Sequence, residues 1–476
     1  MLFRLFYDDQ LAQASYLLGC QTTGEAIVVD PSRVVDQYIA AAEVEGLAIT
    51  AVAETHIHAD FVSGVRELGA RTGARMYLSD AGPPEWKYGF RGDDRVVCLA
   101  GGERLSVGHV VLEPVHTPGH TPEHLSFLVT DGRTSREPMG LLSGDFVFVG
   151  DVGRPDLLEK AVRVSGASDA SARQLFGSLQ WFRTLPDHLQ VWPGHGAGSA
   201  CGKGIGAVPQ STVGYEKRTN WALGNADVEA FVAQILFGQP EPPRYFGIMK
   251  RMNRDGPPVL GRFPAPERLA ETRLPALLAT GAGVVVDTRP APAFGGGHIP
   301  GSVNVPLNRA FATYAGSVLP YDRDLYLLVE GGTPVLERVI RHLVMIGLDR
   351  IAGYLGSEAI ELWAGSGHEL ATVEQITPAE AARRQAMGAI VVDVRGESEW
   401  RGGHIGGARL IPLPELMERL EEIPTDRPVV TQCQSGARSA IAASLLRARG
   451  WRDVANLAGG YSAWVGEGMP VEGKRE

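Results

Sequence analysis

The sequence THIHADFVSG, residues 55–64, determines how the first half of the chain is interpreted. It places His56, His58 and Asp60 at alternate positions of a short loop. The run before it, residues 47–54 (LAITAVAE), is apolar and rich in β-formers, which predicts a buried strand. Side chains at the end of a buried strand are held in a fixed geometry, as a catalytic metal requires. The stretch therefore predicts a metal site.

Three further strand-like runs also end in histidine or aspartate. They are residues 110–124, which close on VHTPGHTPEH, residues 141–145 (LLSGD) and residues 191–195 (VWPGH). A single such histidine is ordinarily a buried or exposed residue with one hydrogen bond, so no one of them indicates a metal. Four such strand ends in one half of the chain together indicate a metal site, because imidazole and carboxylate are ligands of transition metals.

Length and composition limit the classes of protein to consider. The chain has 476 residues, which predicts about three domains. The net charge is -10 without a basic cluster, so nucleic acid and anionic membranes are disfavoured as partners. No apolar run is long enough to span a membrane, and the N-terminus is not that of a secretory signal. Four widely spaced cysteines form no disulfide framework, which predicts a cytoplasmic protein.

The second half of the chain contains an internal repeat, which follows a Pro- and Gly-rich linker at residues 237–266. The sequence VVVDTR around Asp287 recurs as VVDVR around Asp393, and His298 and His404 are separated by the same 106 positions. Strands alternate with helical patterns in both copies. We therefore expect two tandem domains with parallel sheets and crossover helices.

The two copies differ where a nucleophile would lie. In the second copy, residues 429–438 (VVTQCQSGAR) predict a strand, a tight loop that begins at Cys433, and a helix. A sulfur at a helix N-terminus is favoured as a thiolate or persulfide anion. In the first copy, residues 325–335 (LYLLVEGGTPV) carry Glu330 and no cysteine. A carboxylate cannot carry sulfane sulfur, so we expect this copy to be inactive.

The order HxHxD, HTPGHT, SGD, PGH resembles the metallo-β-lactamase superfamily over residues 1 to about 240. The resemblance implies two stacked sheets flanked by helices, with the metal at one edge. Hydrolases of that superfamily usually carry HxHxDH, whose last histidine serves a second zinc, and here that position is Phe61. A two-metal mechanism of hydrolysis is therefore disfavoured.

The remaining residues, as the resemblance implies, divide into ligands and supporting groups. His56, His116 and Asp145 match the two-histidine, one-carboxylate triad of non-haem Fe(II) oxygenases, whose open positions bind substrate and O2. We expect three further residues to orient these ligands by hydrogen bonds, namely His58, Asp60 and His195.

Within the superfamily the chain is similar to the persulfide dioxygenases. The similarity lies in residues 145–158 (DFVFVGDVGRPDLL) and 214–221 (GYEKRTNW). In that family an arginine after the aspartate binds the glutathione part of the substrate, and Arg154 stands in that position. An exposed ion pair is the alternative role for this arginine. Cys201 lies in a glycine-rich loop, residues 194–206, where a packing cysteine is favoured and a reactive thiol is the alternative.

The repeated domains resemble the rhodanese sulfurtransferases. The resemblance rests on DVRGESEWRGGHIGGA followed by a CxxGxR loop. It implies that Cys433 takes up the sulfane sulfur and that Arg438 adds positive charge. Backbone N–H groups would come from the residues between them, Gln434, Ser435, Gly436 and Ala437.

Together these features predict a fold of the α/β class in three parts: an αββα metallo-β-lactamase domain at 1–245, an inactive rhodanese-like domain at 265–365 and an active one at 373–476. We expect one Fe(II) per chain, with zinc or manganese as alternatives. The first domain would oxidise glutathione persulfide, or another small-thiol persulfide, with O2 to sulfite. The last would transfer sulfane sulfur, with sulfite and thiosulfate as partners. The chain is expected to act in sulfide metabolism and to form a homo-oligomer.

Two alternative functions stay open. One is a zinc-dependent thioester hydrolase of the glyoxalase II type, fused to a sulfurtransferase. The other is a persulfide carrier or sensor in which the metal is only structural. Structural zinc sites are closed by four protein ligands, often cysteine, which disfavours the second alternative.

Overall fold

The structure is a computed structural model that describes residues 1–157, 159 and 166–473. Its contacts divide the chain into two compact units. The first contains Met1–Phe263 with Val344–Gly347, and the second contains Pro264–Leu343 with Leu348–Glu476. Leu158, at the end of the dioxygenase-like stretch, and residues 474–476, at the end of the predicted third domain, lie outside the described residues.

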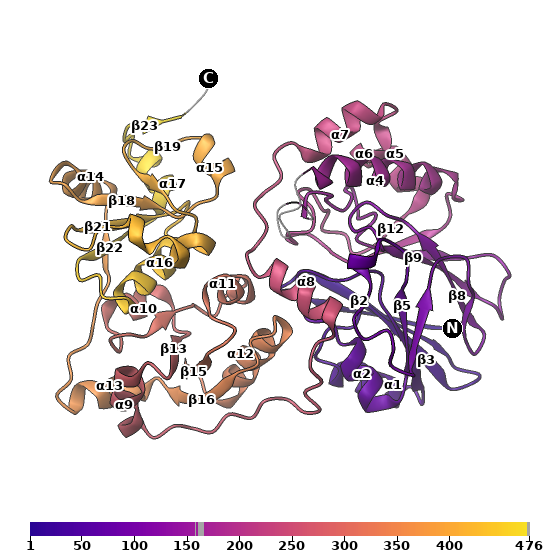
Figure 1. The fold of residues 1–476 in the computed structure, drawn as a ribbon, viewed down its shortest axis with the longest axis horizontal. Helices are drawn as coiled ribbons and strands as arrows, with labels where there is room; N and C mark the ends of the chain where they lie inside the picture. The colour runs from indigo at the N-terminus through magenta and orange to yellow at the C-terminus, as the bar shows by residue number, and fades with distance from the viewer. Residues whose placement is uncertain (158, 160–165, 474–476) are drawn as a thin grey trace. The chain divides into compact units, whose positions relative to one another are not determined.

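The first unit contains two six-stranded sheets, one from each half of its sequence (Figure 1). The first sheet has the order β1 (Leu2–Asp8), β2 (Gln13–Cys20), β3 (Glu25–Val29), β4 (Ala48–Ala53), β5 (Arg75–Ser79) and β6 (Val96–Leu99). The second has the order β12 (Ser211–Thr212), β11 (Gln190–Pro193), β10 (Gly140–Gly144), β9 (Leu125–Asp131), β8 (Val110–His116) and β7 (Leu105–Val107).

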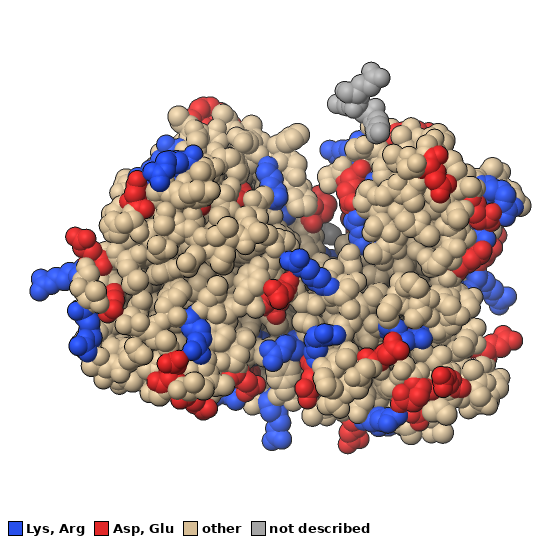
Figure 2. Space-filling view, turned by 180° about the vertical axis from the view of Figure 1, so that it is seen from behind, with Lys and Arg blue, Asp and Glu red and all other residues tan. Residues whose placement is uncertain are grey.

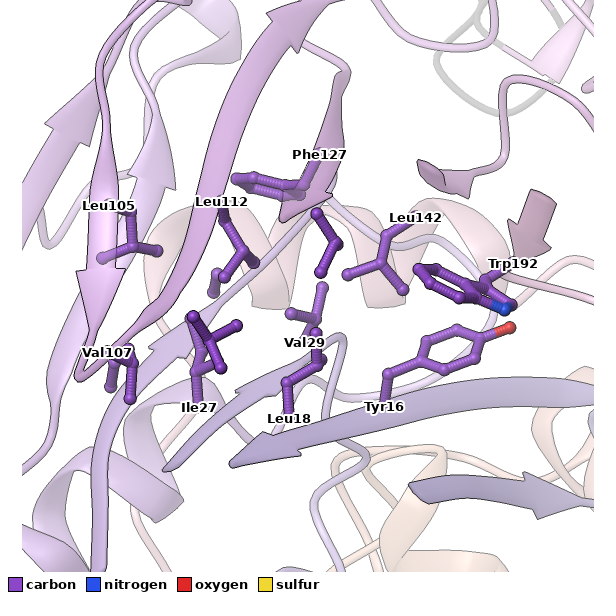
Figure 3. Close-up of a cluster of buried hydrophobic side chains, with 14 of the residues drawn as sticks. Tyr16, Leu18, Ile27, Val29, Leu105, Val107, Leu112, Phe127, Leu142 and Trp192 are labelled. Carbon is purple, nitrogen blue, oxygen red and sulfur yellow. The ribbon is translucent and has the colours of Figure 1, made fainter. Parts of the chain in front are cut away.

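The main apolar core lies between these sheets (Figure 3). Alternate residues of each strand point inward, so Leu18 and Ile27 of the first sheet face Leu112 and Phe127 of the second. The Tyr16 hydroxyl lies at the margin of this core and donates a hydrogen bond to the Pro193 carbonyl (2.7 Å). The core thereby fixes β4, β10 and β11, whose ends carry the predicted metal-binding residues.

Helices cover the outer faces of both sheets through two further apolar clusters. Those of the first unit are α1 (Asp36–Val44), α2 (Val65–Thr72), η1 (Pro84–Trp86), α4 (Ala167–Thr184), α5 (Val213–Thr219), α6 (Trp221–Gly224), α7 (Val228–Leu236) and α8 (Phe246–Asp255). The predicted αββα sandwich is confirmed. The first unit continues through α8, past the expected end at residue 245.

The second unit contains two parallel sheets, as the internal repeat predicts. One has the order β14 (Val303–Asn304), β13 (Gly283–Asp287), β15 (Asp324–Val329), β16 (Ile351–Gly356). The other has the order β17 (Glu374–Ile376), β22 (Val454–Leu457), β21 (Val429–Gln432), β18 (Ile390–Asp393), β20 (Arg409–Leu410). The short strands β19 (His404–Ile405) and β23 (Val471–Glu472) pair antiparallel.

Crossover helices connect these strands. In the first copy they are η2 (Glu271–Arg273), α9 (Leu274–Thr280), α10 (Ala291–Gly296), α11 (Phe311–Val318), α12 (Thr333–Met345) and α13 (Glu358–Gly365). In the second they are α14 (Pro378–Ala386), α15 (Glu397–Arg401), η3 (Leu413–Glu418), η4 (Leu420–Glu422), α16 (Ala437–Ala448) and α17 (Gly460–Gly466). The second unit therefore has the predicted α/β fold.

The surface agrees with the charge balance of the sequence. On the face drawn in Figure 2, basic and acidic side chains are interspersed, and no basic patch gathers there. Over the residues that the structure describes, none of the helices has the length and apolar character of a membrane span.

Candidate metal centre and sulfur-transfer loop

Three buried side chains meet where strands of the two sheets end. His56 follows β4, His120 lies in the loop between β8 and β9, and Asp145 follows β10. One ligand atom from each lies within 4.8 Å of the others. Asp145 Oδ2 is 3.9 Å from His56 Nε2 and 3.4 Å from His120 Nε2. All three side chains are at most 2% exposed.

Hydrogen bonds fix which nitrogen of His56 faces the centre. The Thr55 hydroxyl donates its proton to Asp30 Oδ2 (2.9 Å), so it accepts the bond from His56 Nδ1 (2.9 Å). Nδ1 of His56 therefore carries the proton, and Nε2 presents a lone pair toward Asp145. A hydrogen bond behind a metal-ligating histidine commonly sets its orientation in this way.

His120 is oriented in the same manner. Its Nδ1 lies 3.1 Å from the carbonyl oxygen of Arg154, which can only accept, so Nε2 again presents a lone pair to Asp145. Both carboxylate oxygens of Asp145 are buried and without a hydrogen-bond partner among the described residues. Lone pairs that face one another in a buried site repel unless a cation lies between them. The three residues therefore fit a bound metal ion.

This geometry corrects one predicted ligand, because His116 is not part of the cluster. His116 is the last residue of β8, and its side chain is exposed. Its Nε2 is hydrogen-bonded to the Pro122 carbonyl (2.8 Å) across the turn that follows. That turn carries His120 inward instead. At Gly119, φ is +147° and a Cβ would overlap Leu175, so the turn requires glycine there.

A second group of donors adjoins the first. Ligand atoms of Asp60, His195 and Cys201 also lie within 4.8 Å of one another. His195 Nδ1 contacts the Ala12 carbonyl (3.0 Å), and its Nε2 is 3.4 Å from Asp60 and 3.5 Å from Asp145. Burial, reinforced by Asp145 and Asp60, raises the pKa of Cys201 well above its usual value. Cys201 is buried as predicted, but against the metal centre.

Asp30 anchors the metal-binding loop, and the sequence analysis did not identify it. It follows β3 with φ +52°, a conformation in which non-glycine residues are uncommon. Its carboxylate accepts the Thr55 N–H (2.7 Å) and lies 3.2 Å from His58 Nε2. Burial lowers the pKa of His58, but the carboxylates of Asp30, Glu54 and Asp60 together raise it, to about 9. The Asp-Pro pair after a strand was the available signal for this residue.

His124 is a second residue that the sequence analysis missed. Its Nε2 accepts the backbone N–H of Asp145 (3.1 Å), and its Nδ1 is hydrogen-bonded to the Thr117 hydroxyl (2.9 Å). Burial, together with His120, lowers the pKa of His124 to about 3. The ring therefore stays neutral and holds the Asp145 backbone in place.

Helix α8 supplies the third missed residue, Asn253. Its Nδ2 donates to the carbonyls of His58 (2.8 Å) and Phe61 (2.7 Å), and its Oδ1 accepts the N–H of Ser63 (2.9 Å). One buried amide thus satisfies three backbone groups of the metal-binding loop. The α8 sequence contains no motif that indicates this role.

The Cys433 loop lies between β21 and α16, as predicted. The Cys433 sulfur accepts hydrogen bonds from the Gly436 N–H (3.1 Å) and the Ser439 hydroxyl (3.4 Å). Both donors favour negative charge on the sulfur. The start of α17 holds the loop, because the Tyr461 N–H donates to the Cys433 carbonyl (2.7 Å). Cys433 is 1% exposed.

The side chains of the other loop residues are exposed or paired within the protein. Gln434, Ser435 and Ala437 have exposed side chains. Arg438 forms a bidentate ion pair with Glu399 of α15 (2.7 and 2.8 Å), so its positive charge is largely compensated within the protein.

The first copy lacks this site, as the sequence predicts. Glu330 follows β15 as Cys433 follows β21, and its side chain is exposed. The loop is shorter, with only Gly331 and Gly332 before α12, and both glycines have positive φ. This copy therefore presents no nucleophile at the position of Cys433.

Family models match the same regions of the chain. Residues 8–195 match the model of the metallo-beta-lactamase superfamily, and residues 271–352 and 377–467 match that of the rhodanese-like domain. The crystal structure of a metallo-beta-lactamase from Staphylococcus aureus is 43% identical with a TM-score of 0.68, and the match covers 75% of this chain and 99% of that one. The chain belongs to the metallo-beta-lactamase superfamily. Two rhodanese-like domains follow its metallo-beta-lactamase domain.

Curated relatives match smaller portions. A hydroxyacylglutathione hydrolase from Rhodospirillum rubrum is 32% identical over 182 residues, 38% of this chain and 60% of the relative. The first three curated relatives are matched over 60% to 65% of their own lengths. The crystal structure of ETHE1 from Myxococcus xanthus is 25% identical, with a TM-score of 0.44 and coverage of 55% of this chain and all of its own.

Arg154 of the metallo-beta-lactamase domain has a buried guanidinium that binds only protein groups, which corrects its predicted role in substrate binding. Its side chain is fully buried and pairs with Asp156 through two hydrogen bonds of 2.7 Å. The third nitrogen, Nη1, donates to the carbonyl of Ala200 (3.2 Å), and Nη2, which already bonds Asp156, also donates to the carbonyl of Pro240 (2.6 Å). All of its nitrogens are therefore engaged within the protein, and Arg154 connects the backbone behind His120 to the loop that carries Cys201.

Proposed function

We propose that the metallo-beta-lactamase domain oxidises a low-molecular-weight persulfide, such as glutathione persulfide, to sulfite, and that the last rhodanese-like domain transfers sulfane sulfur through Cys433. The observation that carries the proposal is the buried triad of His56, His120 and Asp145. Two histidines and one carboxylate are the ligand set of non-haem Fe(II) oxygenases. Iron bound there supplies a redox-active Lewis acid with open positions for substrate and O2.

Phe61 supports a single metal in the proposed reaction. It occupies the position where hydrolases of the superfamily carry a histidine for a second zinc, and its ring packs 4.4 Å from that of His58. A phenyl ring offers no ligand. The overall reaction balances as a persulfide, O2 and water giving a thiol and sulfurous acid, with four electrons passing from the sulfane sulfur to O2.

The protein residues around the triad would hold the ligands rather than react. Asp30 and Thr55 fix His56, and His124 fixes the backbone of Asp145. The low exposure of these side chains excludes bulk water, which limits competing hydrolysis. In the sulfur transfer, the Cys433 thiolate would attack the sulfane sulfur of a persulfide or of thiosulfate. The new S–S bond leaves a Cys433 persulfide and releases a thiolate or sulfite.

Oxygen uptake by anaerobically purified, iron-loaded protein on addition of glutathione persulfide tests the proposal. We expect uptake with sulfite formation, lost in His120→Ala and retained in His116→Ala and Cys433→Ser. Cys433→Ser should abolish thiosulfate sulfurtransferase activity without changing oxygen uptake. Absence of uptake from fully iron-loaded protein contradicts the dioxygenase assignment.

A zinc-dependent thioester hydrolase is the second candidate. It is favoured by the similarity to hydroxyacylglutathione hydrolases and by the second donor group of Asp60, His195 and Cys201. Hydrolysis of S-lactoylglutathione by zinc-loaded protein, with two zinc ions per chain, would support it. One metal per chain and no thioester hydrolysis would exclude it.

A further inference from the structure

The inactive rhodanese-like domain lies against the helix that follows the Cys433 loop. Helix α16 is buried without interruption from Ser439 to Leu446, on every side rather than along one stripe. A helix buried all round must be covered from more than one direction. Its own sheet covers one side through β21 and β22, and β14 of the inactive copy contacts it from another. The Asn304 N–H donates to the Ser444 hydroxyl (3.0 Å) across this interface.

Helix α11 of the inactive copy extends the same interface toward the sulfur-transfer loop. It packs on η3 of the active copy, and η3 in turn packs on α16. Phe311 and Ala315 of α11 are buried, as are Leu413 and Leu416 of η3. Apolar packing thus fixes α11 beside the active copy, and Tyr314 lies on this helix.

Tyr314 is within electrostatic reach of the groups that form the Cys433 site. Burial raises the pKa of Tyr314; Arg438 works against this increase, whereas Cys433 and Glu399 add to it. Tyr314 in turn acts on Arg438. The phenol therefore stays protonated at neutral pH and can donate a hydrogen bond. Among the contacts recorded for the described residues, the half-buried Tyr314 hydroxyl has no hydrogen-bond partner.

From this arrangement we infer that the inactive rhodanese-like domain completes the active one, and that Tyr314 binds the sulfur oxyanion, thiosulfate or sulfite, at Cys433. The inference rests on the proposed sulfur transfer at that residue. A dianion needs donors at its oxygens, and Arg438 is already engaged by Glu399. The Tyr314 hydroxyl supplies a donor without adding charge.

The step that Tyr314 would assist is balanced. The Cys433 thiolate attacks the outer sulfur of thiosulfate, the S–S bond of thiosulfate breaks with its electron pair on the leaving sulfite, and a Cys433 persulfide anion forms. No electrons are gained from or lost to a third party. The hydrogen bond from Tyr314 would hold the sulfonate oxygens before and after this transfer.

The first test measures thiosulfate-to-cyanide sulfur transfer by the full-length chain. A hydrogen bond to a charged group contributes enough binding energy that Tyr314→Phe should raise the KM for thiosulfate about tenfold. kcat should change less than twofold, because the nucleophile and its loop are untouched. Tyr326→Phe is the matched control, since Tyr326 packs against the apolar core of the same inactive domain. An unchanged KM in Tyr314→Phe overturns the inference.

The second test does not need turnover. Thiosulfate binding to Cys433→Ser protein is measured by calorimetry with and without Tyr314→Phe, and the substitution should weaken binding about tenfold. If the wild-type chain transfers no sulfur but this difference is observed, the proposed sulfurtransferase activity fails and the binding role of Tyr314 stands. Equal affinity with and without the hydroxyl, or no binding to Cys433→Ser, overturns the role of Tyr314.

Discussion

The choice between His120 and His116 as the second histidine ligand can be tested by two substitutions. His120→Ala removes one of three donors in a site where the other two face each other across 3.9 Å. Loss of a group that only orients a ligand costs about 10- to 100-fold in metal affinity. Loss of a ligand should cost more, so we expect Fe(II) affinity to fall at least about 100-fold, or about 2.7 kcal/mol.

His116→Ala should behave differently. Its side chain is exposed, and its one recorded hydrogen bond is to the Pro122 carbonyl. Such a bond contributes about 1 kcal/mol to stability, and its loss leaves the metal donors in place. We therefore expect Fe(II) affinity within about threefold of the wild type, because no ligand is removed.

Both variants are loaded with Fe(II) under anaerobic conditions and titrated with a chromogenic chelator, and far-UV circular dichroism checks that each is folded. Retention of iron by a folded His120→Ala protein, together with loss of iron from His116→Ala, would refute the assignment. Loss of iron from both would show that the turn between the two histidines, rather than His120 alone, forms the site.

Three other predictions concern stability. Asn253→Ala leaves two carbonyls and one N–H of the metal-binding loop unpaired. It should therefore lower the free energy of unfolding of the first unit in urea by about 2–4 kcal/mol and weaken metal binding. The control Asn225→Ala, at a partly exposed site, should cost under about 1 kcal/mol. Gly460→Ala would place a Cβ against the Cys433 carbonyl at a residue with φ +57°, so it should lower the free energy of unfolding by about 2 kcal/mol or more and abolish sulfur transfer. Gly466→Ala, in the same helix with open space around it, should do neither. Normal sulfur transfer by Gly460→Ala would contradict the loop geometry. Burial lowers the pKa of His298 from 6.5 to about 4, so its contribution to the free energy of unfolding is present above pH 6.5 and is lost as the pH falls toward 4. Between pH 7.5 and pH 4 the wild type should therefore lose up to about 3 kcal/mol more stability than His298→Asn does. Equal pH dependence of the two proteins would refute this.

The sequence predicted the fold because its local signals agreed with one another. The strands before His56 and Asp145 are apolar and bounded by turn residues, and the repeat around Asp287 and Asp393 marks two copies of one domain. Hydrophobic periodicity and motif spacing depend on residues that are close in the sequence. The helices and strands of both units follow largely from such local patterns, so the sequence was sufficient to predict them.

The details of the site depend on contacts that spacing does not encode. HTPGH offers two histidines to one metal, and alternation along β8 gives no preference for His120, which lies beyond the strand and is turned inward by Gly119. Asn253 reaches the loop from nearly two hundred residues away. Arg154 carries a motif position typical of substrate binding, yet Asp156, two residues on, already engages its guanidinium. Each of these outcomes required the tertiary structure.

Helix α8 has a practical consequence for anyone who dissects or recombines this protein. It lies beyond residues 8–195, where the superfamily model matches, and in the stretch that composition alone marks as a linker. A gene fragment cut at residue 245 would encode every metal ligand but would leave the carbonyls of His58 and Phe61 without the Asn253 amide. The apparent spacer after the metallo-beta-lactamase domain is thus a component of that domain. An exchange of modules between enzymes of this architecture should place its junction after residue 263.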